Sequence, residues 1–243
     1  MNYSWNWMVL LEPSPTGEGS YLWLLVTGLK WTVATALSAW AVAVIFGTIV
    51  GIARTWPLKL AQTASKVYVT VFRNLPLIVQ LFIWYFVFPE LLPKELAAQV
   101  KQLEYGPFYT AVWAIGLSMS ARVAEQVRSG IQAIAVGQVG AGLALGFNTG
   151  QLYRYVLLPQ SFRYIVPTLT TDFTTTVKAT SVALTIGLAE LTAQANAVQE
   201  YSFQVFEAFT AATILYVGVN GVVAVLMRWL EKVLEVPGMS IGK

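Results

Sequence analysis

The sequence predicts an all-α integral membrane protein with about five transmembrane helices and one amphipathic loop on the cytoplasmic side. Hydrophobic residues make up 56% of the 243 residues and charged residues only 11%, and the mean hydropathy is +0.62. Such a composition is typical of an integral membrane protein rather than a water-soluble one. Apolar runs long enough to cross a bilayer recur along the chain, with basic residues gathered between them.

The first 20 residues are expected to form an external lead-in, followed by a transmembrane domain at residues 21–236 and a cytoplasmic tail at residues 237–243. The lead-in holds Trp5 and Trp7 but no basic residue and no cleavage site of small residues. It therefore differs from a signal peptide, and we expect an exposed amphipathic segment.

Five spans are predicted, at residues 31–53, 67–89, 108–127, 164–191 and 208–227. The first holds no charge and exceeds the about 20 residues that a helix needs to cross the hydrocarbon core. In the second span, Pro76 should kink or break the helix. In the third, Arg122 and Glu125 lie one turn apart and can form an ion pair.

The distribution of Lys and Arg predicts the orientation of the chain. Nine of these residues fall in the segments assigned to the inside, whereas only Lys94 and Lys101 fall in those assigned to the outside. Because basic residues concentrate on the cytoplasmic side, the N-terminus is expected outside and the C-terminus inside.

Residues 137–160 are the one long polar and amphipathic stretch, and they predict a helix–Gly–helix elbow. The first short helix should stop at Gly146, since glycine accepts the left-handed conformation found just past a helix end. Asn148 and Gln151 have the spacing of a capping box at the start of the second helix. Pro159 is expected to end that helix. On this pattern alone, an interfacial helix pair with no docking role is equally open.

Two motifs carry a resemblance to a known family. The run at residues 72–86, FRNLPLIVQLFIWYF, resembles the signature FRGTPLLVQLFFIYF of the polar amino acid permeases of ABC transporters. The elbow resembles their "EAA" loop, with Gly140 and Gly142 flanking Ala141 where Glu-Ala-Ala is usual. The likeness covers residues 67 to 191. The branch for glutamate and aspartate is the most similar, because Arg122 stands where relatives for other amino acids more often have tyrosine.

The resemblance implies the permease of a type I ABC importer, a multi-pass protein of the bacterial inner membrane. Its implied partners are an ABC ATPase subunit, a second permease in a homo- or heterodimer, an external substrate-binding protein, the amino-acid substrate and membrane lipid, with no nucleic acid. ATP would bind the partner, and no cofactor is expected in this chain. The residues expected to couple to the ATPase are Gly137, Ala141, Leu145, Gly146, Leu158 and Pro159.

The composition also argues against catalysis by this chain. It contains no cysteine and no histidine, which removes thiolate ligands and the commonest general base. No loop of the GxxxxGK[ST] type is present to hold nucleotide phosphates. We therefore expect ATP hydrolysis on a separate subunit.

Charged residues inside predicted spans are the candidate substrate site. A basic residue at the centre of a span costs about 2.5–3.5 kcal/mol on insertion scales and persists only when it is paired or faces water. The candidates are Arg73, Gln80, Arg122, Glu125, Lys178 and Ser181. Snorkelling of Arg73 and Lys178, and a purely structural role of Arg122, remain alternatives. A self-contained channel or secondary carrier for small anions is the alternative function.

Overall fold

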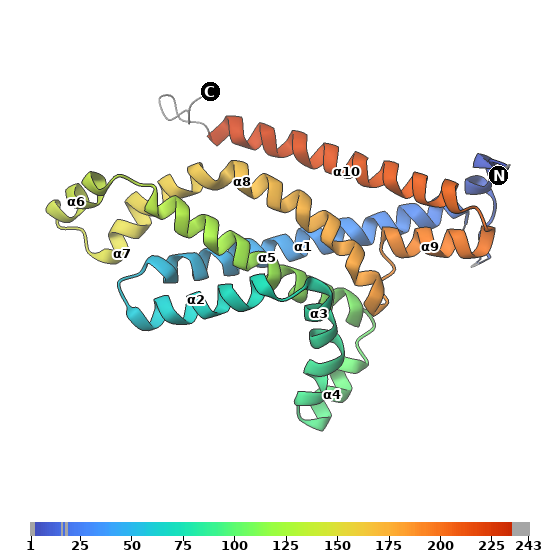
Figure 1. Cartoon of the computed structure of the whole chain (residues 1–243), viewed down its shortest axis with the longest axis horizontal. Helices are drawn as coiled ribbons and strands as arrows, with labels where there is room; N and C mark the ends of the chain where they lie inside the picture. The colour runs from blue at the N-terminus through green and yellow to red at the C-terminus, as the bar shows by residue number, and fades with distance from the viewer. Residues whose placement is uncertain (1–2, 16, 18, 235–243) are drawn as a thin grey trace. The chain divides into compact units, whose positions relative to one another are not determined.

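A computed structural model describes residues 3–15, 17 and 19–234 (Figure 1). The predicted cytoplasmic tail at residues 237–243 lies outside the described residues. Within the described part the only β structure is an isolated bridge between Pro13 and Ser20. The α-helices are α1 (Tyr21–Thr55), α2 (Lys59–Asn74), α3 (Leu77–Phe82), α4 (Lys94–Lys101), α5 (Gly106–Gln132), α6 (Val136–Ala144), α7 (Thr149–Leu152), α8 (Leu158–Ala179), α9 (Leu191–Ser202) and α10 (Val205–Leu234).

In the described part of the chain, short helices of other kinds connect these elements. Three are 3₁₀ helices: η1 (Trp7–Leu11), η3 (Phe88–Leu91) and η5 (Thr180–Ile186). Two are π-helices, η2 (Ile83–Val87) and η4 (Tyr153–Leu157). The all-α prediction is therefore confirmed for the described residues.

The chain divides into two compact units. The first comprises Met1–Trp40, Pro76–Gly116 and Thr175–Val222, and the second comprises Ala41–Leu75, Leu117–Thr174 and Val223–Lys243. The core of the first unit joins the N-terminal segment to the starts of α1, α9 and α10. Its buried members are Val9, Tyr21, Leu24, Leu25, Leu191, Ala195, Val198, Ala208 and Ala212.

The second unit depends on a close approach between α1 and α5. A β-carbon added at Gly47 would lie 2.5 Å from Cβ of Val123, and one added at Gly51 would lie 2.6 Å from Cβ of Val127. These two glycines stand four residues apart on one face of α1. Small residues at this spacing let two membrane helices pack backbone against side chain, so larger residues would push α5 away.

Two helices of the described chain, α1 and α10, are long and apolar enough to cross a membrane, or three if α2 and the helical stretch after it count as one broken span. The helix α1 begins at Tyr21, well before the predicted start, and takes in Lys30, whose Nζ lies 4.8 Å from the centre of the Trp23 ring. The predicted third and fifth spans coincide with α5 and α10, and the fourth with α8 and η5.

The second predicted span is not one continuous helix. The helix α2 ends at Asn74, Leu75 adopts an extended conformation, and α3 begins directly after Pro76. A proline disfavours helical geometry in the residue before it, and its fixed φ suits the start of a new helix. The expected break at Pro76 is therefore confirmed.

Candidate functional site

The elbow in the second unit begins with α6, which ends as the sequence predicts. Gly146 has φ +81°, in the left-handed region. The Phe147 amide donates to the carbonyl of Gly142 (3.1 Å), and the Gly146 amide donates to that of Leu143 (3.0 Å). This pair of bonds is the Schellman motif, which satisfies carbonyls at the end of a helix. A residue with a side chain would be strained at Gly146.

The next helix, α7, starts with the predicted capping box. Oδ1 of Asn148 accepts from the Gln151 amide, and the Asn148 amide donates to Oε1 of Gln151, both at 2.9 Å. Local hydrogen bonds thus fix the end of α6 and the start of α7, the two short helices of the elbow (Figure 1).

The prediction that Pro159 ends the second helix is wrong. The chain runs from α7 through η4 into α8, and Pro159 is the second residue of α8. The Leu158 amide donates to the carbonyl of Tyr153, five residues back. This wider turn lies directly before the proline, which lacks an amide proton and would crowd a regular helix there. The same arrangement recurs in η2, directly before Phe88 and Pro89.

The elbow presents apolar side chains to its surroundings. Exposed fractions are 85% for Val136, 76% for Leu145 and 56% for Leu143. An exposed apolar surface of this kind, held on a rigid frame, is typical of a docking site. Of the residues predicted to couple to an ATPase, Leu158 is half-buried, and the exposed ones are Gly137, Ala141, Leu145, Gly146 and Pro159.

The two glycines that replace the usual residues of the "EAA" triplet differ in their surroundings. An added β-carbon at Gly140 would meet open space, whereas one at Gly142 would lie 2.8 Å from Cδ1 of Leu152. Gly142 therefore lets α7 pack closely on α6. An alanine there would require Leu152 to move, while Gly140 has no such constraint.

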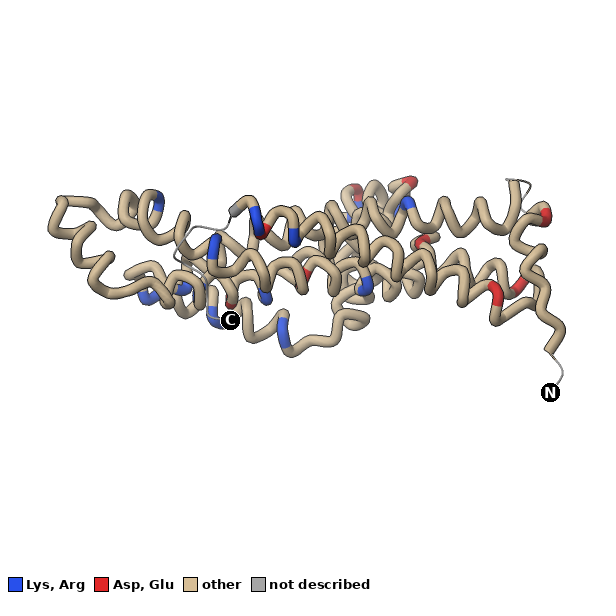
Figure 2. Tube along the Cα trace, turned by 90° about the horizontal axis from the view of Figure 1, so that it is seen from above, with Lys and Arg blue, Asp and Glu red and all other residues tan. Residues whose placement is uncertain are grey.

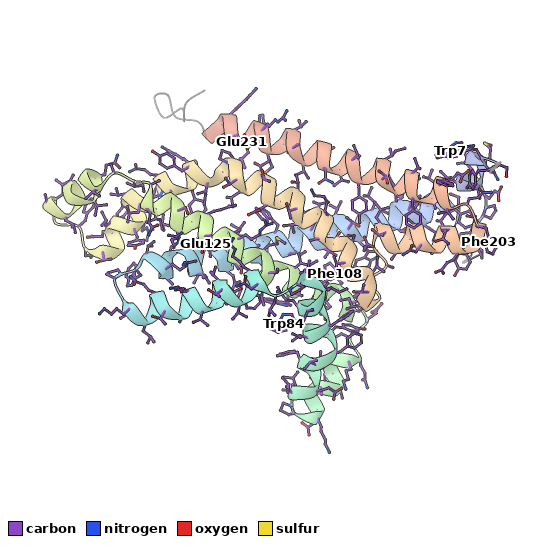
Figure 3. The ribbon with its side chains drawn as sticks, viewed as in Figure 1. Trp7, Trp84, Phe108, Glu125, Phe203 and Glu231 are labelled. Carbon is purple, nitrogen blue, oxygen red and sulfur yellow. The ribbon has the colours of Figure 1, made fainter. Side chains whose placement is uncertain are left out.

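A group of charged side chains, here called the Glu125 cluster, lies in the second unit. It is centred on Glu125 of α5, which Figure 3 labels. The other members are Arg54 from α1, Arg73 from α2 and Arg128 from α5. Nε of Arg128 donates to Oε2 of Glu125 at 2.8 Å, and Arg54 donates to Oε1. Nη1 of Arg73 lies 3.7 Å from the same Oε1. One carboxylate thus holds guanidinium groups from three helices.

The predicted pair between Arg122 and Glu125 is absent from the ion pairs of the described residues. Arg122 instead lies 3.6 Å from Oδ1 of Asp172 on α8, and Gln126 donates to Oδ2 of Asp172 at 2.6 Å. The spacing along α5 permitted the predicted pair, but α1 and α2 bring other arginines to Glu125. Asp172 was not predicted from the sequence as the partner of Arg122. A single acidic residue in a threonine-rich membrane helix nevertheless indicates that a basic partner lies nearby.

The remaining predicted site residues belong to the first unit. Gln80, on α3, is only 2% exposed, and α3 packs on η5, which carries Ser181. The Ser181 hydroxyl donates to the carbonyl of Lys178 at 2.8 Å. Lys178 itself is exposed on the last turn of α8. The fold therefore places Gln80 and Ser181 on neighbouring elements.

A buried carboxylate that the sequence did not single out joins three helices of the first unit. Glu190 is fully buried and caps α9, with Oε1 accepting from the Ala193 amide at 2.8 Å. Oε2 accepts from the Tyr216 hydroxyl on α10 at 2.7 Å. The Thr32 hydroxyl on α1 donates to the same Oε2 at 3.5 Å and accepts from the Leu191 amide at 3.1 Å. Because these bonds satisfy the carboxylate, its role is structural.

Comparison with known proteins places these features in a family. A family described as "Binding-protein-dependent transport system inner membrane component" matches residues 22–236. The glutamate/aspartate import permease protein GltJ of Escherichia coli K12 is 40% identical, with all of both chains covered. The glutamine transport system permease protein GlnP of the same strain is 30% identical over 88% of this chain and 94% of its own.

Solved structures agree with this result. An amino acid ABC transporter crystallised with histidines has a chain that matches with a TM-score of 0.74 and 28% identity, over 87% of this chain and 94% of its own. A chain of the MetNI methionine ABC transporter matches with a TM-score of 0.72 at 21% identity and supports the fold alone. The chain belongs to the family of binding-protein-dependent transport system inner membrane components.

Proposed function

We propose that this chain is the permease subunit of an ATP-driven importer of polar amino acids, with glutamate and aspartate as its substrates. The observation that carries the proposal is the capped elbow of α6 and α7, a rigid apolar surface in a chain without a nucleotide-binding loop. The 40% identity to a glutamate/aspartate import permease over the full length supports the substrate class.

In this proposal the elbow docks on an ATPase subunit, which binds and hydrolyses ATP. A second permease, identical or different, completes the pathway, and an external binding protein delivers the amino acid. The N-terminus lies outside and the C-terminus inside, as the asymmetry of Lys and Arg favours. Conformational change in the ATPase reaches α8 through the unbroken helical path from α7.

The proposed substrate site uses the cations of the spans. Arg122, with 49% of its side chain exposed, takes the side-chain carboxylate, because a guanidinium binds carboxylate through two parallel hydrogen bonds. Arg73 or Lys178 takes the α-carboxylate, and Gln80 and Ser181 are neutral supports.

Glu125 has a more limited part in this proposal than the sequence suggested. Both of its oxygens already accept from arginines in the Glu125 cluster. Its contribution is therefore to orient Arg73, and direct contact with the amino group of the substrate requires one of these bonds to break.

Crosslinking from the elbow tests the docking part of the proposal. The chain has no native cysteine, so Leu145→Cys creates a single reactive site. Because Leu145 is 76% exposed on the elbow, this variant is expected to crosslink to the ATPase in the assembled complex. Leu103→Cys, between α4 and α5, is a matched exposed control that should not. Failure at position 145 in a complex shown to be assembled, or equal crosslinking from both positions, would count against docking at the elbow.

A further inference from the structure

The N-terminal segment at residues 3–11 forms an aromatic patch with the start of α10, at the corner where α9 ends (Figure 3). The patch comprises Tyr3, Trp5, Trp7 and Phe206. Ring centres lie 4.7 Å apart for Tyr3 and Phe206, 5.7 Å for Trp5 and Phe206, and 5.7 Å for the stacked pair Trp5 and Trp7. Four rings from two distant parts of the sequence thus pack as one group.

Hydrogen bonds and a buried side chain hold this segment in place. The Asn6 amide donates to Oε1 of Glu207 at 2.7 Å, and the Tyr3 hydroxyl donates to Oε2. Desolvation, and then the bond to Glu207, raise the pKa of Tyr3, so its phenol remains a donor. Val9 of η1 is only 4% exposed, within the core that also contains the starts of α1 and α10. The segment is therefore fixed to the ends of two candidate spans.

The outward side of the same segment is apolar and uncharged. Exposed fractions are 58% for Trp5, 67% for Met8 and 61% for Leu11, and residues 3–11 contain no Asp, Glu, Lys or Arg. Figure 2 shows no blue along this part of the tube. Phe203 adds an 84% exposed ring at the neighbouring corner, in a left-handed conformation (φ +59°) that bulky residues rarely adopt.

The charge pattern of α10 sets the depth of this patch in a membrane. Residues 208–227 form an uncharged run of 20 residues between Glu207 and Arg228. At about 1.5 Å per residue this run spans about 30 Å, the thickness of the hydrocarbon core. Phe206 and Glu207 then lie just outside the core, at the level of the lipid headgroups. Trp and Tyr are enriched at this level, where an apolar ring and a polar edge are both satisfied.

We propose that residues 3–11 form an interfacial anchor that lies in the headgroup layer, with Trp5, Met8 and Leu11 in contact with lipid. An uncharged, tryptophan-rich surface at the end of a membrane-crossing helix fits lipid as its occupant. The anchor precedes residues 22–236, which the family model matches. The inference depends on α10 crossing the membrane, and it does not depend on which substrate is carried.

Spin labelling of the complete complex tests the anchor. The absence of native cysteine allows labels at Met8→Cys and Leu11→Cys without other changes. The complex is placed in nanodiscs of phosphatidylethanolamine and phosphatidylglycerol, and accessibility to oxygen and to a water-soluble nickel chelate is calibrated with spin-labelled lipids of known depth. Both labels are expected at headgroup depth. Their oxygen-to-nickel ratio should be several-fold above that of a label at Gln102→Cys, which is exposed just after α4.

Two other results would contradict the proposal that residues 3–11 lie in the headgroup layer. A ratio equal to that of Gln102→Cys would place the segment in water. Shielding from both reagents would place it under a protein partner, such as a binding protein. Because the readout is membrane depth, it stays informative even if the complex transports no glutamate, so failure of the anchor and failure of the proposed function are distinguishable.

Discussion

Replacing Glu125 by alanine is expected to destabilise the chain more than any other single change in the Glu125 cluster. The substitution leaves Arg54, Arg73 and Arg128 close together without their shared carboxylate. Removing one partner of a fully buried ion pair costs about 3–5 kcal/mol. Partial exposure of the cluster lowers the expected loss to roughly 2–3 kcal/mol, because solvent screens the remaining charges. The measurement is the thermal unfolding midpoint of the assembled complex, which should fall by about 5–10 °C.

Arg73→Ala is the matched control for this prediction. Its side chain is 53% exposed and its Nη1 lies 3.7 Å from Oε1 of Glu125, whereas the Arg54 side chain is only 14% exposed and in closer contact. Removing Arg73 should therefore change the unfolding midpoint little. The unfolding midpoint of Glu125→Gln should lie between those of the parent and Glu125→Ala. Equal losses for Glu125→Ala and Arg73→Ala would contradict the assignment of Glu125 as the centre of the cluster.

Replacing Arg122 by glutamine is expected to reduce acidic amino-acid uptake by about one to two orders of magnitude. A hydrogen bond to a charged group contributes about 1.5–3 kcal/mol, and Arg122 is the residue proposed to read the side-chain carboxylate. Uptake of labelled glutamate by the full complex is the measurement, with ATPase assembly checked separately.

The lysine variant separates recognition from structure. Arg122 also lies 3.6 Å from Asp172, so Arg122→Lys keeps a positive charge near that carboxylate. The thermal unfolding midpoint of this variant should therefore stay close to that of the parent. The variant loses the planar fork, however, and uptake should remain low. If Arg122→Gln assembles and transports glutamate as well as the parent, Arg122 is structural and the selectivity hypothesis fails.

Local features of this chain could be predicted from the sequence alone. Gly146, Asn148 and Gln151 act through hydrogen bonds to residues within five positions, so the end of α6 and the start of α7 were correctly predicted. The break at Pro76 is local as well, because a proline restricts the backbone of the residue directly before it. Pro159 was misjudged because a π turn before a proline depends on how the helix is packed, which the local sequence does not reveal.

Contacts between distant segments could not be predicted in this way. The partner of Glu125 on α5 depends on where α1 places Arg54, and the partner of Arg122 depends on α8. Likewise, nothing near Glu190 in the sequence indicates that Tyr216 would reach it. The expected exposed lead-in proved to be fixed to α10 through Glu207, because an acid about 200 positions later provides the acceptor.

We expect this chain to move acidic amino acids only as part of an ATP-driven complex. The measurement is the uptake of labelled glutamate into vesicles, with one set holding this subunit alone and another holding the complete complex with ATP available to the ATPase. We predict accumulation only in the second set, and its loss when ATP is withheld. Uptake by the subunit alone, without ATPase or ATP, would contradict the account and identify a self-contained channel or secondary carrier.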